Sequence, residues 1–129
     1  MIRILVLIGL IATPAAARTP ADVPEVVNGL VTVGAADLIR KNCDSIAPRM
    51  IRAVGFIKSL ESTARGAGFS SAEVDAYVDD AAEKERLLAM SYKVLFDKGV
   101  DPAAPATYCT VGRAEIGAGS QIGRLLKNK

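Results

Sequence analysis

The chain contains no histidine and only two cysteines in 129 residues. Without histidine it cannot carry a histidine-based catalytic triad, nor the imidazole acid–base chemistry that operates near pH 7. A closed zinc site is disfavoured, because two cysteines would need carboxylate help. The glycines follow no predicted strand, so they form neither type of nucleotide-phosphate loop. These absences favour a protein that is not an enzyme and that uses no cofactor and no metal, although catalysis by carboxylates alone stays open.

A strong excess of either charge is also lacking. The whole chain has 16 Lys and Arg against 14 Asp and Glu, a net charge of +2. No basic stripe with interleaved aromatic residues occurs, so we expect no nucleic-acid partner.

The first seventeen residues have the pattern of a cleaved export signal. Arg3 supplies the positive start, residues 4–11 form a short apolar core, and Ala15, Ala16 and Ala17 follow the helix-breaking Pro14. The alternative is a membrane anchor, but the apolar run is far shorter than the roughly 20 residues that span a bilayer. We therefore predict cleavage after Ala17, a periplasmic or secreted location and no transmembrane segment in the mature chain.

The mature chain would have 112 residues, with 15 Lys and Arg against 14 Asp and Glu, because Arg3 is removed. This length suits one domain. In an oxidising compartment, Cys43 and Cys109 most simply form a disulfide. The alternative is a pair of free or metal-binding thiols. A crosslink over 66 positions would stabilise the fold by about 4 kcal/mol in the chain-entropy model.

Apolar spacing predicts an all-α fold, a small bundle of four to five helices with one disulfide. The longest predicted helix, Ser70 to Gly99, is expected to be uninterrupted and to be the element around which the others pack. Ser70 and Glu73 fit a capping box, and Gly99 fits the left-handed stop.

The remaining chain divides at proline and glycine. Residues 18–23 are predicted to be a flexible tether that precedes a helical domain over residues 24–129. Gly29 and Gly34 lie inside the first helix, where we expect them to allow close approach of a neighbour rather than to mark a marginal helix. The last helix should break near residues 117–120, with Ser120 capping a short terminal helix. The predicted segments are a helix over 24–42, a turn over 44–48, a helix over 48–67, a connection over 100–105 and the broken helix over 106–127.

The second helix has an apolar stripe that we expect to face the core. No strand pattern is evident. The stripe consists of Met50, Ala53, Val54, Ile57, Leu60 and Ala64.

Glu85 is the one carboxylate whose angular position lies within the apolar stripe of the long helix. A covered carboxylate needs a partner or a shifted pKa. The available cations are Arg49, Arg52 and Arg113, so we predict a buried ion pair with one of them. An acid–base site built from the same residues is the functional alternative.

Asp75, Asp79 and Glu83 are spaced four residues apart and would stand in a row on one helix face. A solvated face is the simpler interpretation, because calcium usually takes six to eight oxygens from a wrapping loop.

The chain resembles a family of small exported bacterial proteins of unknown function. The resemblance implies an all-helical exported domain with one disulfide and no established activity. Members are sometimes labelled as the component of the respiratory NADH dehydrogenase that holds a two-iron cluster, but such a cluster takes four cysteines and this chain has two. The resemblance spans most of the mature chain and is carried by residues 42–46, Pro48, Arg49, Arg52, Ala53, Phe56, Ala64, Arg65, residues 68–70 and 76–78, Tyr108, Cys109, residues 111–113, Glu115, Ile116, Ser120, Ile122 and Gly123.

These observations favour a non-enzymatic interaction or accessory protein with a protein partner. A carrier of a small apolar ligand or lipid inside the bundle is an alternative, which predicts an apolar cavity. An accessory factor of the respiratory NADH dehydrogenase is a further alternative, and an unusual enzyme would need a pocket lined by carboxylates and arginines.

Overall fold

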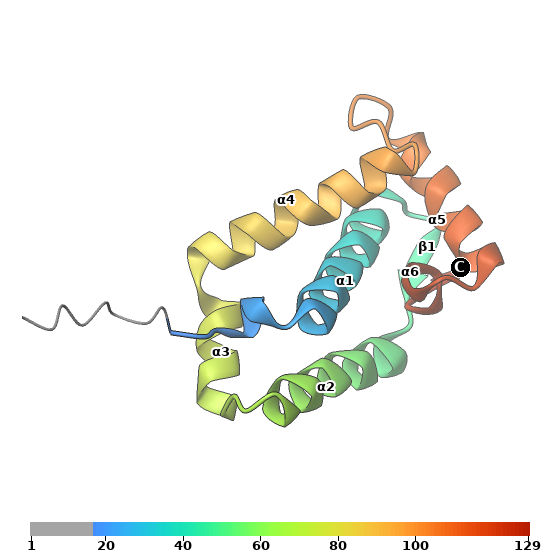
Figure 1. The fold of residues 1–129 in the computed structure, drawn as a ribbon. Helices are drawn as coiled ribbons and strands as arrows, with labels where there is room; N and C mark the ends of the chain where they lie inside the picture. The colour runs from blue at the N-terminus through green and yellow to red at the C-terminus, as the bar shows by residue number, and fades with distance from the viewer. Residues whose placement is uncertain (1–16) are drawn as a thin grey trace, which may run out of the picture.

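A computed structural model describes residues 17–129 (Figure 1). The predicted export signal lies outside the described residues except for Ala17. Within them the fold is a bundle of six α-helices with a two-stranded sheet, which confirms the predicted all-α class. The elements in chain order are η1 (Pro20–Asp22), α1 (Pro24–Asn42), β1 (Ile46–Pro48), α2 (Met50–Gly66), α3 (Ser71–Asp79), α4 (Ala81–Asp97), α5 (Ala106–Ala118), α6 (Gln121–Arg124) and β2 (Leu126–Asn128).

The helix at the centre of the fold is α1. It lies between α4 and α2 and also contacts α5 and α6 (Figure 1). Its Ala35 and Ile39 are completely buried. The bounds predicted for this helix are confirmed. The expectation that residues 70–99 would be the central element is wrong, because α1 supplies the face that most other helices cover.

Two glycines of α1 allow its neighbours to approach closely, as predicted. A Cβ atom added at Gly29 would lie 2.2 Å from Leu60 Cδ2 of α2. One added at Gly34 would lie 2.3 Å from Ser91 Oγ of α4. Each glycine therefore marks a helix crossing where a larger side chain would overlap its neighbour.

Residues 70–99 form two helices and not the single helix that the apolar spacing predicted. Asp80 adopts extended backbone angles, φ −65° and ψ 126°, between α3 and α4. Its carboxylate accepts a hydrogen bond at 2.9 Å from the backbone N–H of Glu83 and caps α4. Aspartate is a preferred N-cap because it satisfies an otherwise orphaned N–H group, so it competes with helix continuation. The outer signals are confirmed: Ser70 and Glu73 form the capping box, and Gly99 has φ 107°.

Residues 18–23 are ordered against the bundle, in contrast to the predicted tether. Thr19 and Asp22 form a capping box around η1, and Pro20 is buried. The guanidinium of Arg18 lies 5.5 Å from the centre of the Phe69 ring. A local cap and contacts with α3 and the preceding loop give this short segment its fixed position.

The C-terminal region contains the predicted break and an unpredicted strand. Gly119 has φ 62°, and the Ser120 side chain caps α6. The chain then enters β2, which pairs antiparallel with β1. Because each strand has only three residues, neither shows an alternating pattern that sequence analysis could have recognised.

A polar contact joins α5 to the residues on either side of it. The Glu115 carboxylate accepts hydrogen bonds from Ser120 Oγ and lies 2.8 Å from Lys98 Nζ. Its side chain is 12% exposed. Burial raises the pKa of this carboxyl group, but the hydrogen bonds from Lys98 and Ser120 and the charge of Lys98 outweigh burial, so the net pKa is lowered.

Candidate functional site

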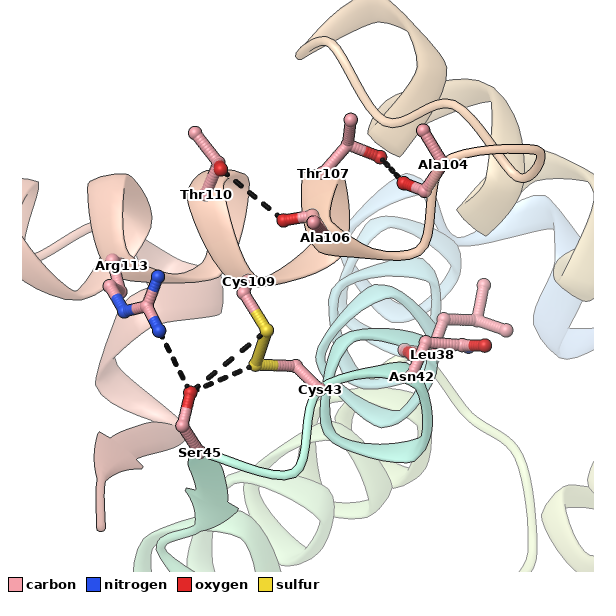
Figure 2. Close-up of a disulfide and its surroundings, with 10 residues drawn as sticks. All are labelled: Leu38, Asn42, Cys43, Ser45, Ala104, Ala106, Thr107, Cys109, Thr110 and Arg113. Carbon is pink, nitrogen blue, oxygen red and sulfur yellow. Dashed lines mark hydrogen bonds between the residues drawn. A yellow bond between two sulfur atoms is a disulfide. The ribbon is translucent and has the colours of Figure 1, made fainter.

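The predicted disulfide between Cys43 and Cys109 is present. The two sulfurs are 2.01 Å apart and the Cα atoms 5.2 Å apart, so the bond joins the end of α1 to α5. Figure 2 shows Ser45 beside the bond: its Oγ lies 3.3 Å from the Cys43 sulfur and accepts a hydrogen bond at 2.9 Å from Arg113. This cluster fixes the turn between α1 and β1.

The predicted ion pair of Glu85 is wrong, because Glu85 is exposed on α4 and forms no salt bridge with a described residue. Arg49 Nε donates instead to the backbone carbonyl of Leu126 at 3.0 Å. Arg113 donates to Ser45, and Arg52 lies exposed beside α6. The error follows from the break at Asp80, which changes the direction of the helix after Val78 and removes Glu85 from the angular frame in which it was placed.

The same break separates the predicted carboxylate row. Asp79 ends α3, whereas Glu83 lies in the first turn of α4 and pairs with Arg86 at 2.8 Å. Among residues 17–129 no three acidic, cysteine or histidine side chains are grouped closely enough to hold a metal ion. These carboxylates therefore act in local helix contacts.

A hollow of about 370 Å³ lies between η1, α3 and the start of α4. It contains Tyr77, whose pKa is raised by burial and by the charge of Glu83, while the neighbouring Arg86 opposes the shift. Two other carboxylates of the hollow, Glu73 and Asp80, cap helices. Because these polar groups already have local partners, the hollow offers a poor candidate for binding.

The clearest candidate is an exposed aliphatic surface on the first two turns of α2. Met50, Ile51, Val54 and Ile57, here called the α2 surface, are 62%, 91%, 45% and 45% exposed. A shallow hollow of about 400 Å³ runs along it and includes Lys58. Soluble proteins seldom leave several large aliphatic side chains exposed together without a use for them.

The sequence placed Met50, Val54 and Ile57 in the core, and the structure shows why that prediction is wrong. The second half of α2 packs on the bundle through Leu60 and Ala64, which are buried. The first half extends past the neighbouring helices, so the same stripe loses its cover. A second signal was available in Ile51, which lies outside the core-facing stripe and has no core position to fill.

Positive charge flanks the α2 surface on both sides. Arg52 shares a hollow of about 530 Å³ with Phe56 and with Arg124 of α6, and Lys58 lies beside Val54 in the other hollow. Between residues 45 and 60 the chain has no carboxylate. The site is thus apolar at its centre and cationic at its edges.

No helix of the described part of the chain combines the length and apolar character that a membrane crossing requires. The chain matches no curated protein and no solved structure. Residues 19–127 match the model of a protein family described as a family of unknown function, DUF5333. This match covers the whole helical bundle, including both cysteines and the α2 surface, and the chain therefore belongs to the DUF5333 family.

Proposed function

We propose that the protein is an exported, non-enzymatic accessory protein that acts in the periplasm or outside the cell by docking onto another component through the α2 surface. The observation that carries this proposal is the exposure of four aliphatic side chains, Met50, Ile51, Val54 and Ile57, on one short stretch of helix. Leaving such side chains in water lowers the gain from folding by about 1.5 to 3 kcal/mol for each one that could have been buried. A docking function gives that cost a purpose.

Two observations support export. The first seventeen residues follow the pattern of a signal peptide. The disulfide is the state expected for two neighbouring cysteines in an oxidising compartment and is uncommon in the cytosol.

The interior of the bundle gives little support to a carrier of an apolar ligand. Gly29 contacts Leu60, Gly34 contacts Ser91, and Gly112 has both Ile39 and Ile46 within reach of a Cβ atom. Such close contacts fill the space along α1 in which a ligand would have to lie. A function at the surface agrees better with this packing.

A protein partner is the expectation from the sequence, and the docking proposal covers a partner of any class. A link to the respiratory NADH dehydrogenase has no residue in this chain to support it beyond the family label, because two cysteines joined as a disulfide cannot hold a two-iron cluster.

The proposal is tested by photocrosslinking in the native host. A benzophenone side chain is introduced in place of Ile51 and, as the control, in place of Ala82, which is also exposed but lies at the start of α4. We expect adducts, detected as a change in mass or gel mobility of the purified protein, from position 51 and not from position 82. Equal yields at the two positions would contradict docking through the α2 surface. Fractionation of the same cells shows whether the protein is exported and processed after Ala17.

A further inference from the structure

We propose that the component bound by the α2 surface is an anionic phospholipid membrane, on which the protein lies without crossing it. This inference rests on the proposed docking function and names its partner. It follows from three features of the described residues: the shape of the aliphatic surface, the charges at its edge and the distribution of charge over the whole chain.

The aliphatic side chains form a ridge and not a cleft. Ile51 is 91% exposed and Met50 is 62% exposed at the first turn of α2, with Val54 and Ile57 one turn further along. Side chains that project in this way can enter the boundary between headgroups and acyl chains, as the apolar face of an interfacial helix does. A stable protein interface usually needs about 20 to 30 residues on each side. A narrow ridge of four side chains is better suited to a membrane, which surrounds whatever is inserted.

The charges beside the ridge are those that anionic headgroups attract. Arg52 and Lys58 flank it, Arg124 shares the hollow of Arg52, and Lys127 follows in β2, which pairs with the residues before α2. None of these four side chains forms a salt bridge with a described residue. Cations near an anionic surface strengthen binding about fivefold each.

The first turn of α2 adds to the positive field. Arg49 occupies the N-cap position without a capping hydrogen bond from its side chain, and the first turn contains no acidic residue. The N-terminal end of a helix carries a partial positive charge, which favours nearby anions. The ridge, the cations and the positive end of the helix therefore coincide.

The opposite sign dominates another part of the chain. Residues 73–85 contain six carboxylates and one lysine, and they form α3 and the start of α4. Figure 1 shows α3 at the end of α2 that lies away from its first turn. An anionic membrane attracts one end of the protein and repels the other, so the charge distribution orients the ridge toward the lipid.

The test measures binding of the full exported chain, purified with its disulfide intact, to lipid vesicles by co-sedimentation. Vesicles of phosphatidylglycerol and phosphatidylcholine in equal parts are compared with vesicles of phosphatidylcholine alone. We expect at least tenfold stronger binding to the anionic vesicles, and weaker binding as salt rises.

Two matched pairs of variants locate the binding surface. Val54→Asp and Leu88→Asp replace side chains of equal exposure, 45% and 46%, on α2 and α4. The first should reduce binding at least tenfold and the second less than twofold. Lys58→Gln should weaken binding about fivefold, and Lys84→Gln should leave it unchanged. Circular dichroism confirms that each variant is folded.

Three results would overturn the inference: equal binding to both vesicles, no binding to either, or equal losses in Val54→Asp and Leu88→Asp. These results are distinguishable from failure of the docking function. A protein adduct from position 51 in cells, together with no vesicle binding, would refute the lipid and leave docking in place. No adduct from position 51 and no vesicle binding would refute both.

Discussion

The closest measurable consequence of the packing around α1 is the effect of replacing Gly34 by alanine. In an exposed helix interior, glycine to alanine stabilises by about 1 kcal/mol, because alanine has the higher helix propensity. Gly55 in α2 provides this reference, since an added Cβ would meet no atom within 4 Å. Gly55→Ala should therefore raise the free energy of unfolding by about 1 kcal/mol.

Gly34→Ala should lower the free energy of unfolding. The new Cβ would lie 2.3 Å from Ser91 Oγ, so the hydroxyl group has to move. That hydroxyl is 1% exposed as part of Ser91 and donates to the carbonyls of Val31 at 3.2 Å and Leu87 at 2.8 Å. Displacing a buried polar group costs about 1 to 3 kcal/mol, and overpacking costs a similar amount. Against the gain in propensity, we expect a net loss of about 2 kcal/mol.

A double-mutant cycle isolates the contact. Ser91→Ala alone should cost about 1 kcal/mol, since it removes a hydroxyl whose acceptor carbonyls remain in helices. Combined with Gly34→Ala it should cost little more, because a Cβ at Gly34 lies 3.1 Å from the Ser91 Cβ and a small shift suffices. Urea unfolding followed by circular dichroism gives each value. Equal effects of Gly34→Ala and Gly55→Ala would refute the close crossing of α1 and α4.

Three further predictions concern the crosslink, the buried carboxylate and the helix break. Replacing Cys43 and Cys109 together by serine should lower the free energy of unfolding by about 4 kcal/mol, and the native protein should resist thiol alkylation until it is reduced. The Glu115 carboxyl has a lowered pKa in the folded state, so its stabilisation is complete above the pKa of the unfolded chain and disappears as pH falls through the folded value; the stability difference between the protein and Glu115→Gln should shrink from pH 7 to pH 3, and a constant difference would contradict this. Asp80→Ala should cost about 1 kcal/mol by loss of the cap, measured by urea unfolding, whereas an unchanged midpoint would show that packing alone maintains the break.

Local chemistry explains why some features could be predicted from the sequence. Ser70, Glu73, Gly99 and Ser120 act on backbone groups a few residues away, so their roles do not depend on the rest of the fold. The disulfide followed from the number of cysteines and the export pattern. The glycines of α1 could be recognised as sites of close approach, but their neighbours could not be named.

The capping role of Asp80 shows where local analysis reached its limit. The apolar spacing through residues 74–95 was compatible with one helix, and an aspartate cap was compatible with two. The choice depends on whether α3 packs better when it turns away from α4, which is a property of the assembled bundle. Every prediction built on the single helix, including the ion pair of Glu85, failed with it.

The sequence by itself determined the helical class, the bounds of α1, the disulfide and the likeness to a family of unknown function, because these depend on local spacing, capping and the count of cysteines. Only the tertiary structure decided that Met50, Ile51, Val54 and Ile57 are exposed. A stripe of aliphatic residues has the same pattern whether a neighbour covers it or not, and cover is decided by where segments distant in the sequence end. The candidate site is therefore a result of the packing of α2 beyond the end of its neighbours, and not of any motif.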